Sequence, residues 1–385
     1  MKRKAKVLTA ALTAAAALSL AAPAASASAS ASARTESSRQ ADTAHAVFVQ
    51  TNGTAGNMIR VFGRAADGSL TSAGEYATGG LGGTEQEAPV DALASQGSLV
   101  YANGLLFAVN AGSDTVTVFK VYDGTRLRRI QVIRSGGDFP VSIAVHGGLA
   151  YVLNAGGQGA LQAYRLSDNR LWPIHGDNRS LHLGNATPPV HISAPAQVLV
   201  SPDGRYVLVP TKNHNTVQVF PSYGGWLASA PVTSASANPV PFAGVFDERG
   251  DLLLTEAGTS TVTAYHLNPD GTLSVVGSSA SDGQAALCWI VGVDGHYYGT
   301  NAGSANFSKF EIGPSGVPVA ETGAASDAGP IDMAASGDYL YVQNAGAGTV
   351  TGYAVNPTDG ALRQVTSVTG LPAYDNGGME GIAAS

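Results

Sequence analysis

A recurring turn carries the side chains that could do chemistry. An apolar run ends repeatedly in an Asn-Ala-Gly-like turn, at Asn52, Asn110, Asn154, Thr211, Glu256, Asn301 and Asn344. Glu256 breaks this pattern, and a carboxylate at an irregular position of a repeat is a candidate general base. We therefore predict a catalytic role for Glu256. The asparagines either cap their turns or contact a ligand, and we predict ligand contacts for Asn110, Asn301 and Asn344.

A second column of side chains opens the strand that precedes each turn. It consists of Ser98, Ser142, Gln197, Ala243, Trp289, Asp332 and Glu380. Trp289 offers a flat apolar surface for a ring-shaped ligand, and Asp332 is a second candidate for acid–base catalysis. We predict a catalytic role for Asp332 and ligand binding by Ser98, Ser142, Gln197, Trp289 and Glu380. Asp91 and Asp138 lie in the segments that enter two of these strands.

Histidines are few, and His191 is the candidate base among them. It lies in an insertion between Leu171 and Pro195, just before one of the column strands. We predict that it overhangs the site as a catalytic base; an exposed loop histidine is the alternative. The histidines lack metal-ligand spacing. A ring of carboxylates from Glu256, Asp332 and Glu380 could hold calcium, which prefers oxygen ligands. We predict neither a metal nor a cofactor.

The elements that must position these residues follow from a repeat. Seven units of about 49 residues share two apolar runs joined by the Asn-type turn. The second run ends in an aromatic residue, and a Gly-containing turn such as Asp67-Gly68 or Asp123-Gly124 follows. Such turns favour hairpins because they require positive φ. Four short antiparallel strands per unit, repeated radially, predict an all-β, seven-bladed propeller over residues 46–385.

The two ends of the repeat predict how the ring closes. The first unit begins at its second strand, near Ala46, and the chain ends in GGMEGIAAS, which aligns with the first strands of the other units. We therefore expect the C-terminal strand to complete the first blade, because an open ring would leave two free sheet edges. A closed ring also predicts a monomer.

Composition excludes several classes of protein. Charged residues make up 13% of the 385 positions, and there are 48 glycines and one cysteine. A disulfide framework and a Cys-rich zinc site are excluded. The net charge of −7 at pH 7, with no basic cluster, argues against a nucleic-acid partner.

The N-terminus predicts export. Residues 1–29 combine a basic start, an apolar stretch and the motif Ala25-Ser26-Ala27, as signal peptides do. This segment has four basic and no acidic residues, so its removal would take the net charge from −7 to −11. Residues 30–45 are predicted to be a flexible linker. No later apolar run reaches the roughly 18 residues of a membrane helix. The expected product is a secreted, soluble protein.

Several stretches resemble a known family. LLFAVNAGSDTVTVF (105–119), FPVSIAVHGGLAYVLNAGG (139–157) and PAQVLVSPDGRYVLV (195–209) are similar to the bacterial lactonase-type seven-bladed propellers. That family is similar to 6-phosphogluconolactonase and to the fungal 3-carboxy-cis,cis-muconate lactonising enzyme. The resemblance covers about 46–385 and implies a propeller fold, with lactone chemistry as the expected activity.

The chain departs from this family at basic positions. The family's Pro-His pair is replaced by Pro195-Ala196-Gln197, and its Gly-Pro-Arg-His by Asn238-Pro239-Val240-Pro241. The family's glutamate is matched by Glu256. Lactone opening places negative charge on oxygen, which needs a nearby donor or cation. Gln197, Trp289 or His191 would have to supply it. A phosphorylated sugar is disfavoured, because an acidic mouth without an arginine cluster would repel it.

Two functions follow from these observations. The first is a secreted lactonase-like hydrolase or isomerase for a small, non-phosphorylated lactone. The second is a non-catalytic extracellular propeller that binds a small molecule or a cell-surface component through the same face, which the missing basic residues favour.

Overall fold

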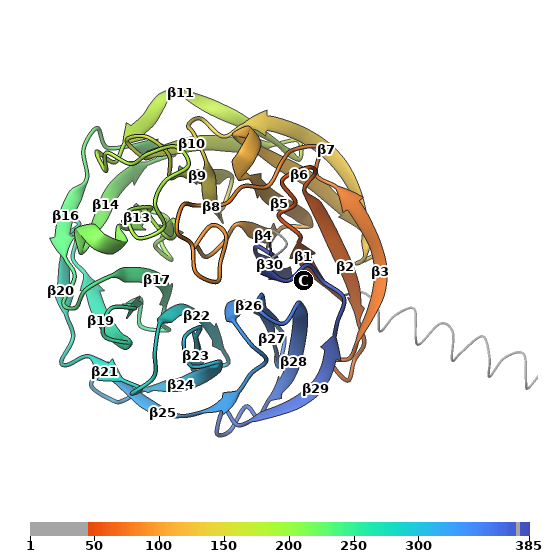
Figure 1. The fold of residues 1–385 in the computed structure, drawn as a ribbon. Coiled ribbons are helices and arrows are strands. Elements are labelled where there is room, and N and C mark those ends of the chain that lie inside the picture. Colours follow the sequence, from red (N-terminus) through yellow and green to blue (C-terminus); the bar gives the residue numbers. More distant parts are fainter. Residues whose placement is uncertain (1–44, 375–377) are drawn as a thin grey trace, which may run out of the picture. The chain divides into compact units, whose positions relative to one another are not determined.

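The computed structural model describes residues 45–374 and 378–385. The predicted signal peptide and all of the linker except His45 lie outside the described residues. Within the described ranges the strands form seven antiparallel sheets arranged as the blades of a ring (Figure 1). The predicted seven-bladed propeller is confirmed.

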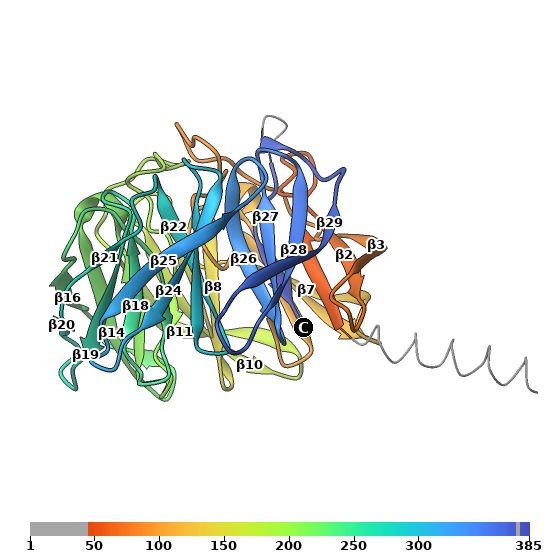
Figure 2. The ribbon, with the colours of Figure 1, turned by 90° about the horizontal axis from the view of Figure 1, so that it is seen from below.

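Blade 1 closes the ring as predicted. It consists of β1 (His45–Gln50), β2 (Met58–Arg64), β3 (Leu70–Ala77) and β30 (Ile382–Ala384). The pairing of β30 with β1 is antiparallel, with Val47 opposite Ala384 and Val49 opposite Ile382. In Figure 2 the C-terminus lies beside the strands of blades 1 and 7. The two ends of the propeller therefore meet in one sheet, which removes both free edges.

The other blades follow in chain order. Blade 2 contains β4 (Leu99–Ala102), β5 (Leu105–Asn110), β6 (Thr115–Tyr122) and β7 (Arg126–Arg134). Blade 3 contains β8 (Pro140–His146), β9 (Leu149–Asn154), β10 (Ala160–Ser167) and β11 (Arg170–Ser180). Blade 4 contains β12 (Leu199–Val200), β13 (Tyr206–Pro210), β14 (Thr216–Tyr223), β15 (Trp226–Leu227) and β16 (Val232–Ala235).

The remaining blades complete the circle. Blade 5 contains β17 (Pro241–Phe246), β18 (Leu252–Glu256), β19 (Thr261–Leu267), β20 (Leu273–Val275) and β21 (Ala280–Ser281). Blade 6 contains β22 (Leu287–Val293), β23 (His296–Asn301), β24 (Asn306–Ile312) and β25 (Pro318–Ala325). Blade 7 contains β26 (Pro330–Ser336), β27 (Tyr339–Asn344), β28 (Thr349–Val355) and β29 (Leu362–Val368). Short 3-10 turns η1 (Ala111–Ser113) and η2 (Lys212–His214) follow β5 and β13.

The blades pack through the aromatic residues predicted from the repeat. Every aromatic that ends a second apolar run is buried: Phe62, Phe119, Tyr164, Phe220, Tyr265, Phe310 and Tyr353. Burying an aromatic side chain stabilises the fold by about 2–3 kcal/mol. These side chains therefore serve the core, and they are not available to a ligand.

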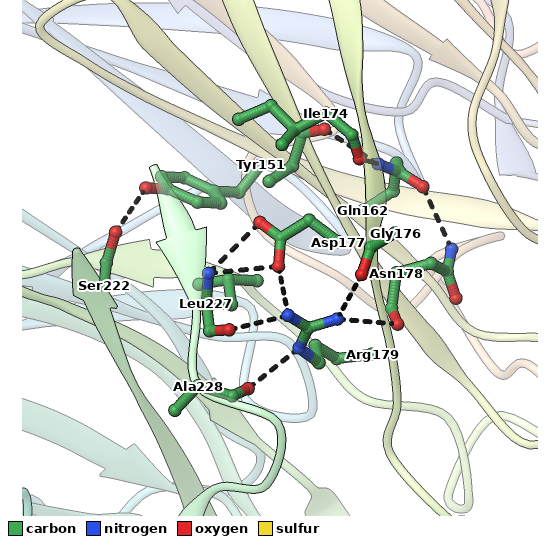
Figure 3. Close-up of polar contacts among 11 residues, drawn as sticks. Tyr151, Gln162, Ile174, Gly176, Asp177, Asn178, Arg179, Ser222, Leu227 and Ala228 are labelled. Carbon is green, nitrogen blue, oxygen red and sulfur yellow. Dashed lines mark hydrogen bonds and ion pairs between the residues drawn. The ribbon is translucent and has the colours of Figure 1, made fainter. Parts of the chain in front are cut away.

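Polar contacts also join neighbouring blades, as between blades 3 and 4 (Figure 3). The buried Asp177 carboxylate accepts hydrogen bonds from the Leu227 backbone N–H at 3.0 and 3.1 Å. Arg179 pairs with Asp177 at 2.5 Å and donates to the carbonyls of Leu227 and Ala228 at 2.7 and 2.8 Å. β11 and β15 are thus held by a desolvated ion pair that is fully hydrogen-bonded. In the described residues no helix has the length and apolar character needed to cross a bilayer.

Candidate functional site

A segment between β3 and β4 crosses the axis of the ring, and we call residues 85–97 the plug. Figure 1 shows it in orange, reaching into the middle of the propeller. Its Ser95 carbonyl accepts a hydrogen bond from Trp289 Nε1 at 2.8 Å. Gln96 exchanges side-chain hydrogen bonds with the Ile290 backbone at 2.9 and 3.0 Å, and its N–H donates to the Ala196 carbonyl. The plug is therefore tied to blades 4 and 6.

Between the plug and blades 4–6 lies a cavity of about 290 Å³. Its wall is mostly apolar, with Val90 and Ala94 from the plug and Phe242, Ala257 and others from the blades. Four side chains that carry polar or reactive atoms join this wall: Asp91, His191, Lys212 and Cys288. An apolar pocket with a few convergent polar groups is the usual form of a small-molecule site. Two larger clefts flank β25 at the outer edge of blade 6; the second contains the Lys309–Glu321 ion pair.

Lys212 is the cation that sequence analysis did not find. Its side chain is 2% exposed, and its ammonium group donates to the His191 carbonyl at 2.7 Å. It lies 5.3 Å from the centre of the Phe242 ring, in cation–π geometry. Glu85 of the plug is its counterion, with 3.7 Å between Nζ and Oε2. The family's basic residues remain absent at 195–197 and 238–241, and Lys212 brings a cation to the cavity from another position.

The repeat itself contained the signal for Lys212. The residue after the turn asparagine is small in the other blades, at Gly53, Ala111, Ala155, Ala257, Ala302 and Ala345. Lys212 is the exception. Its φ of 45° is also in the left-handed region, which an unbranched side chain enters only at some cost. Because Ala257 and Ala302 line the same cavity, a long side chain at this position must reach into it.

Glu85 and His191 complete the polar environment of Lys212. The Glu85 side chain is fully buried, and both its oxygens lack a hydrogen-bond partner among the described residues. Burial raises the pKa of Glu85 well above its usual value, and the Lys212 charge opposes this rise. His191 is half-buried, and its Nδ1 has no partner in the described part of the chain. Burial, and then the charge of Lys212, lower the pKa of His191, so its imidazole is neutral at pH 7.

Trp289 lies in the cavity wall, where it is buried and does not form the partly exposed platform that the sequence predicted. Its side chain is 2% exposed, and its ring meets Phe242 edge-to-face, with centroids 5.0 Å apart. Burial raises the pKa of the neighbouring Cys288 thiol to about 12, which leaves it protonated and unreactive.

The acids divide between two sides of the plug. Asp91 lines the cavity, whereas Asp332 and Gln197 line a second cavity of about 370 Å³ along the innermost strands. Glu380 lies close to both acids, and burial followed by the Asp91 charge raises its pKa well above the usual value. Burial raises the pKa of Asp332 to about 7, although the Met333 N–H opposes this. Asp332 therefore faces a different space from His191 and Lys212.

Three residues of the strand column connect neighbouring blades. Ser142 Oγ donates to the Gln96 carbonyl at 2.7 Å and accepts from the Val198 N–H at 3.2 Å. Gln197 Oε1 accepts from the Gly244 N–H at 2.7 Å. Ser98 Oγ lies against Gly381, where a Cβ would come within 2.2 Å of it. These contacts account for Ser142 and Gln197 without a ligand, whereas the buried Ser98 Oγ has no hydrogen-bond partner among the described residues.

The turn asparagines cap their hairpins through a shared pattern. In three of them the side chain donates to the residues five and seven positions later on the next strand, whereas Asn52 and Asn154 donate to backbone carbonyls. Asn110 reaches Thr115 and Thr117, Asn301 reaches Asn306 and Ser308, and Asn344 reaches Thr349 and Thr351. Their side chains are buried within the blades. The capping alternative explains Asn110, Asn301 and Asn344, and the ligand contacts predicted for them have no counterpart in the cavity.

Glu256 keeps the same pattern with the direction of donation reversed. Its carboxylate accepts from Thr261 at 3.1 Å and Thr263 at 2.6 Å. It also accepts from the Tyr265 and Ser236 hydroxyls and from the backbone and side chain of Asn238. The side chain is fully buried, and its partners belong to blade 5 and the connection from blade 4. These contacts turn Glu256 into the blade and away from the cavity, which accounts for it structurally.

The sequence-predicted residues thus converge only in part. His191 and Trp289 meet at the cavity, Glu380 approaches it through Asp91, and Asp332 lies beyond the plug. Within residues 45–374 and 378–385, no cluster of three or more His, Cys, Asp or Glu side chains has the geometry to hold a metal ion.

Comparison with known proteins supports the fold. No protein-family model and no curated protein matches the chain by sequence. A periplasmic gluconolactonase of Pseudomonas aeruginosa is 20% identical at a TM-score of 0.62, over 86% of this chain and 97% of that one. A protein from Lactobacillus plantarum is 16% identical at a TM-score of 0.66, over 89% and 99% of the two chains.

A third solved structure bears a related name. A Bacteroides fragilis protein with the provisional name 6-phosphogluconolactonase is 14% identical at a TM-score of 0.65, over 89% of this chain and 98% of that chain. The fold is therefore the lactonase-type seven-bladed propeller that the sequence resemblance implied. Identities this low establish the shared fold alone.

Proposed function

We propose that this protein hydrolyses a small, uncharged, non-phosphorylated lactone in the cavity beside the plug. One observation carries the proposal: a histidine whose pKa is lowered and a buried ammonium group line the same apolar cavity. Lactone hydrolysis requires a base to activate water and a positive group beside the carbonyl oxygen. His191 and Lys212 are suited to these two roles.

The cavity also supports a class of substrate. Its volume of about 290 Å³ suits a ring of a few carbon atoms with a short substituent. The Trp289 and Phe242 rings contact the apolar part of such a molecule. A phosphate group is disfavoured, because Glu85 balances the Lys212 charge and Asp91 adds a carboxylate to the wall.

The reaction assigns a role to each polar group. His191 takes a proton from water, whose oxygen attacks the lactone carbonyl carbon. The Lys212 ammonium group stabilises the negative charge on the carbonyl oxygen. Glu85 holds Lys212 in place from behind the wall. Glu256 has no step in this scheme.

A panel of lactones tests the proposal. We expect purified protein to hydrolyse γ-butyrolactone, δ-valerolactone or dihydrocoumarin, and to leave 6-phosphogluconolactone intact. His191→Asn should lower kcat by about 100-fold or more. The matched control is His175→Asn, because His175 is exposed in the same insertion. In the active protein the acid limb of the pH profile should lie below pH 6.5, since the pKa of His191 is lowered.

The second candidate is a binding protein without catalysis. The observation that favours it is the apolar character of the wall, in which Ala94, Ala257, Ala286 and Ala302 are prominent. A lactone panel without turnover, together with calorimetric binding of a neutral ring compound that Phe242→Ala weakens, would support this function and contradict the first.

A further inference from the structure

Two carboxylates share one hydrogen-bond donor beside the cavity. The Leu93 backbone N–H donates to Asp91 Oδ1 and to Glu380 Oε2, each at 3.0 Å. Asp91 also accepts from the Ser95 N–H at 3.2 Å. Their side chains are almost fully buried, with exposures of 2% and 0%. Glu380 Oε1 is buried and has no hydrogen-bond partner among the described residues.

Two buried carboxylates around one N–H group repel each other when both are ionised. Ionising both would bury two negative charges side by side around one N–H group. Burial and the adjacent Asp91 charge both raise the pKa of Glu380 well above its usual range. Glu380 therefore holds its proton to a higher pH than an exposed glutamate does.

The surrounding charges reinforce this state. Asp332 adds a negative charge to the environment of Glu380, and Glu85 faces Asp91 from within the plug. The Tyr374 hydroxyl approaches the same acids. Lys212 is the nearby cation, and its counterion is Glu85. His191 and the protonated Cys288 thiol lie on the cavity side.

We propose that Asp91 and Glu380 act as one proton-donating pair for the leaving oxygen of the substrate, with Asp91 as the catalytic residue and Glu380 as its positioning residue. This inference rests on the proposed lactone hydrolysis. Asp91 belongs to the cavity wall, so it reaches the substrate, and Glu380 acts through it.

The proton balance of the step is as follows. Water bonds to the carbonyl carbon and gives its proton to His191. The ring C–O bond then breaks, and its electron pair stays on the ring oxygen, which takes the proton held by the Asp91–Glu380 pair. A proton returns from His191 to the pair through solvent. One water is consumed, and a hydroxy acid is released.

Proton donation by the Asp91–Glu380 pair should accelerate the hydrolysis of some lactones more than others. An aliphatic ring oxygen leaves poorly as an alkoxide and needs a proton, whereas a phenol oxygen leaves without one. We therefore infer that the site serves lactones of aliphatic alcohols. The test compares δ-valerolactone, an aliphatic lactone, with dihydrocoumarin, whose leaving group is a phenol.

Asp91→Asn and Glu380→Gln are the variants, and Glu248→Gln is the control because Glu248 is exposed. Each variant should lower kcat for δ-valerolactone by about 100-fold, and for dihydrocoumarin by less than about 10-fold. In the wild type, hydrolysis of δ-valerolactone should fall as pH rises through the apparent pKa of the pair. Glu380→Gln should remove that limb. Equal losses on both lactones would overturn the proposal while leaving the proposed function intact.

A second readout does not depend on turnover. A raised pKa of Glu380 means that the unfolded chain loses the proton first, so stability falls as pH rises above about 4.5. Thermal unfolding of the wild type should show this fall, and Glu380→Gln should reduce it. Identical pH profiles of stability for both proteins would refute a shared proton. If no lactone is hydrolysed but the pH profiles of stability differ, the proposed function is contradicted, whereas the shared proton of Asp91 and Glu380 is supported.

Discussion

Lys212 Nζ, in the wall of the cavity, lies 3.7 Å from Glu85 Oε2 behind that wall, with both side chains withdrawn from solvent. The lysine follows β13 of blade 4, and the glutamate comes from the plug. At this separation the two groups attract each other without a direct hydrogen bond. Both Glu85 oxygens lack a hydrogen-bond partner among the described residues, and Glu85 lies behind the residues that line the cavity.

Substitutions of Lys212 and Glu85 should show separately what the Lys212 charge contributes to stability and to catalysis. Lys212→Met leaves Glu85 buried without a counterion and should cost about 3–5 kcal/mol in the free energy of unfolding. The double variant Lys212→Met/Glu85→Gln should recover most of that loss, because neither charge remains. Urea unfolding measures both effects.

Lactone hydrolysis by the same variants tests the role of the charge. The double variant should fold like the wild type and still lose about 100-fold or more in kcat, since nothing stabilises the carbonyl oxygen. Wild-type turnover by the double variant would contradict the role assigned to Lys212.

Glu256→Gln should destabilise the fold without acting on the chemistry. The substitution replaces one of two oxygens that each accept three hydrogen bonds. We expect a loss of about 2 kcal/mol in urea unfolding, with kcat preserved below the unfolding transition. Glu248→Gln, at an exposed position of the same blade, is the control. Loss of turnover in a variant of unchanged stability would restore Glu256 as the base.

Asp332→Asn should change how stability depends on pH. The pKa of Asp332 is raised to about 7 from an ordinary value of 3.8. The unfolded chain therefore gives up this proton first, and stability falls as pH rises from about 4 to about 7. Asp332→Asn should lack this pH dependence. Between pH 4 and pH 8 its unfolding free energy should therefore fall by about 2–4 kcal/mol less than that of the wild type. Asp338→Asn, exposed in the same blade, should follow the wild-type curve. Parallel curves for all three proteins would contradict a raised pKa.

Arg179→Met should loosen the contact between blades 3 and 4. The change leaves the Asp177 carboxylate buried without its ion-pair partner and removes the hydrogen bonds to the Leu227 and Ala228 carbonyls. We expect about 3–5 kcal/mol of lost stability. Arg170→Met on the same strand, where the arginine is exposed, should be neutral. If the unfolding free energies of the two variants differ by less than about 1 kcal/mol, the Asp177–Arg179 ion pair contributes little to stability.

Local sequence determined the architecture. Strand length, alternating apolar residues and turns such as Asp123-Gly124 depend on neighbours along the chain. Their sevenfold recurrence therefore predicted the blades, and the unmatched ends predicted the pairing of β1 with β30. The capping alternative for the asparagines was also accessible, because its partners lie five and seven residues away.

Tertiary structure decided the site. A repeat irregularity identifies a position without saying which way its side chain points. Glu256 turned into its blade because Thr261 and Thr263 donate to it, whereas Lys212 turned into the cavity. The contact between Asp91 and Glu380 joins residues from distant parts of the chain, and no local pattern encodes it. Ring closure and the path of the plug bring them together, so their shared proton arises only in the folded protein.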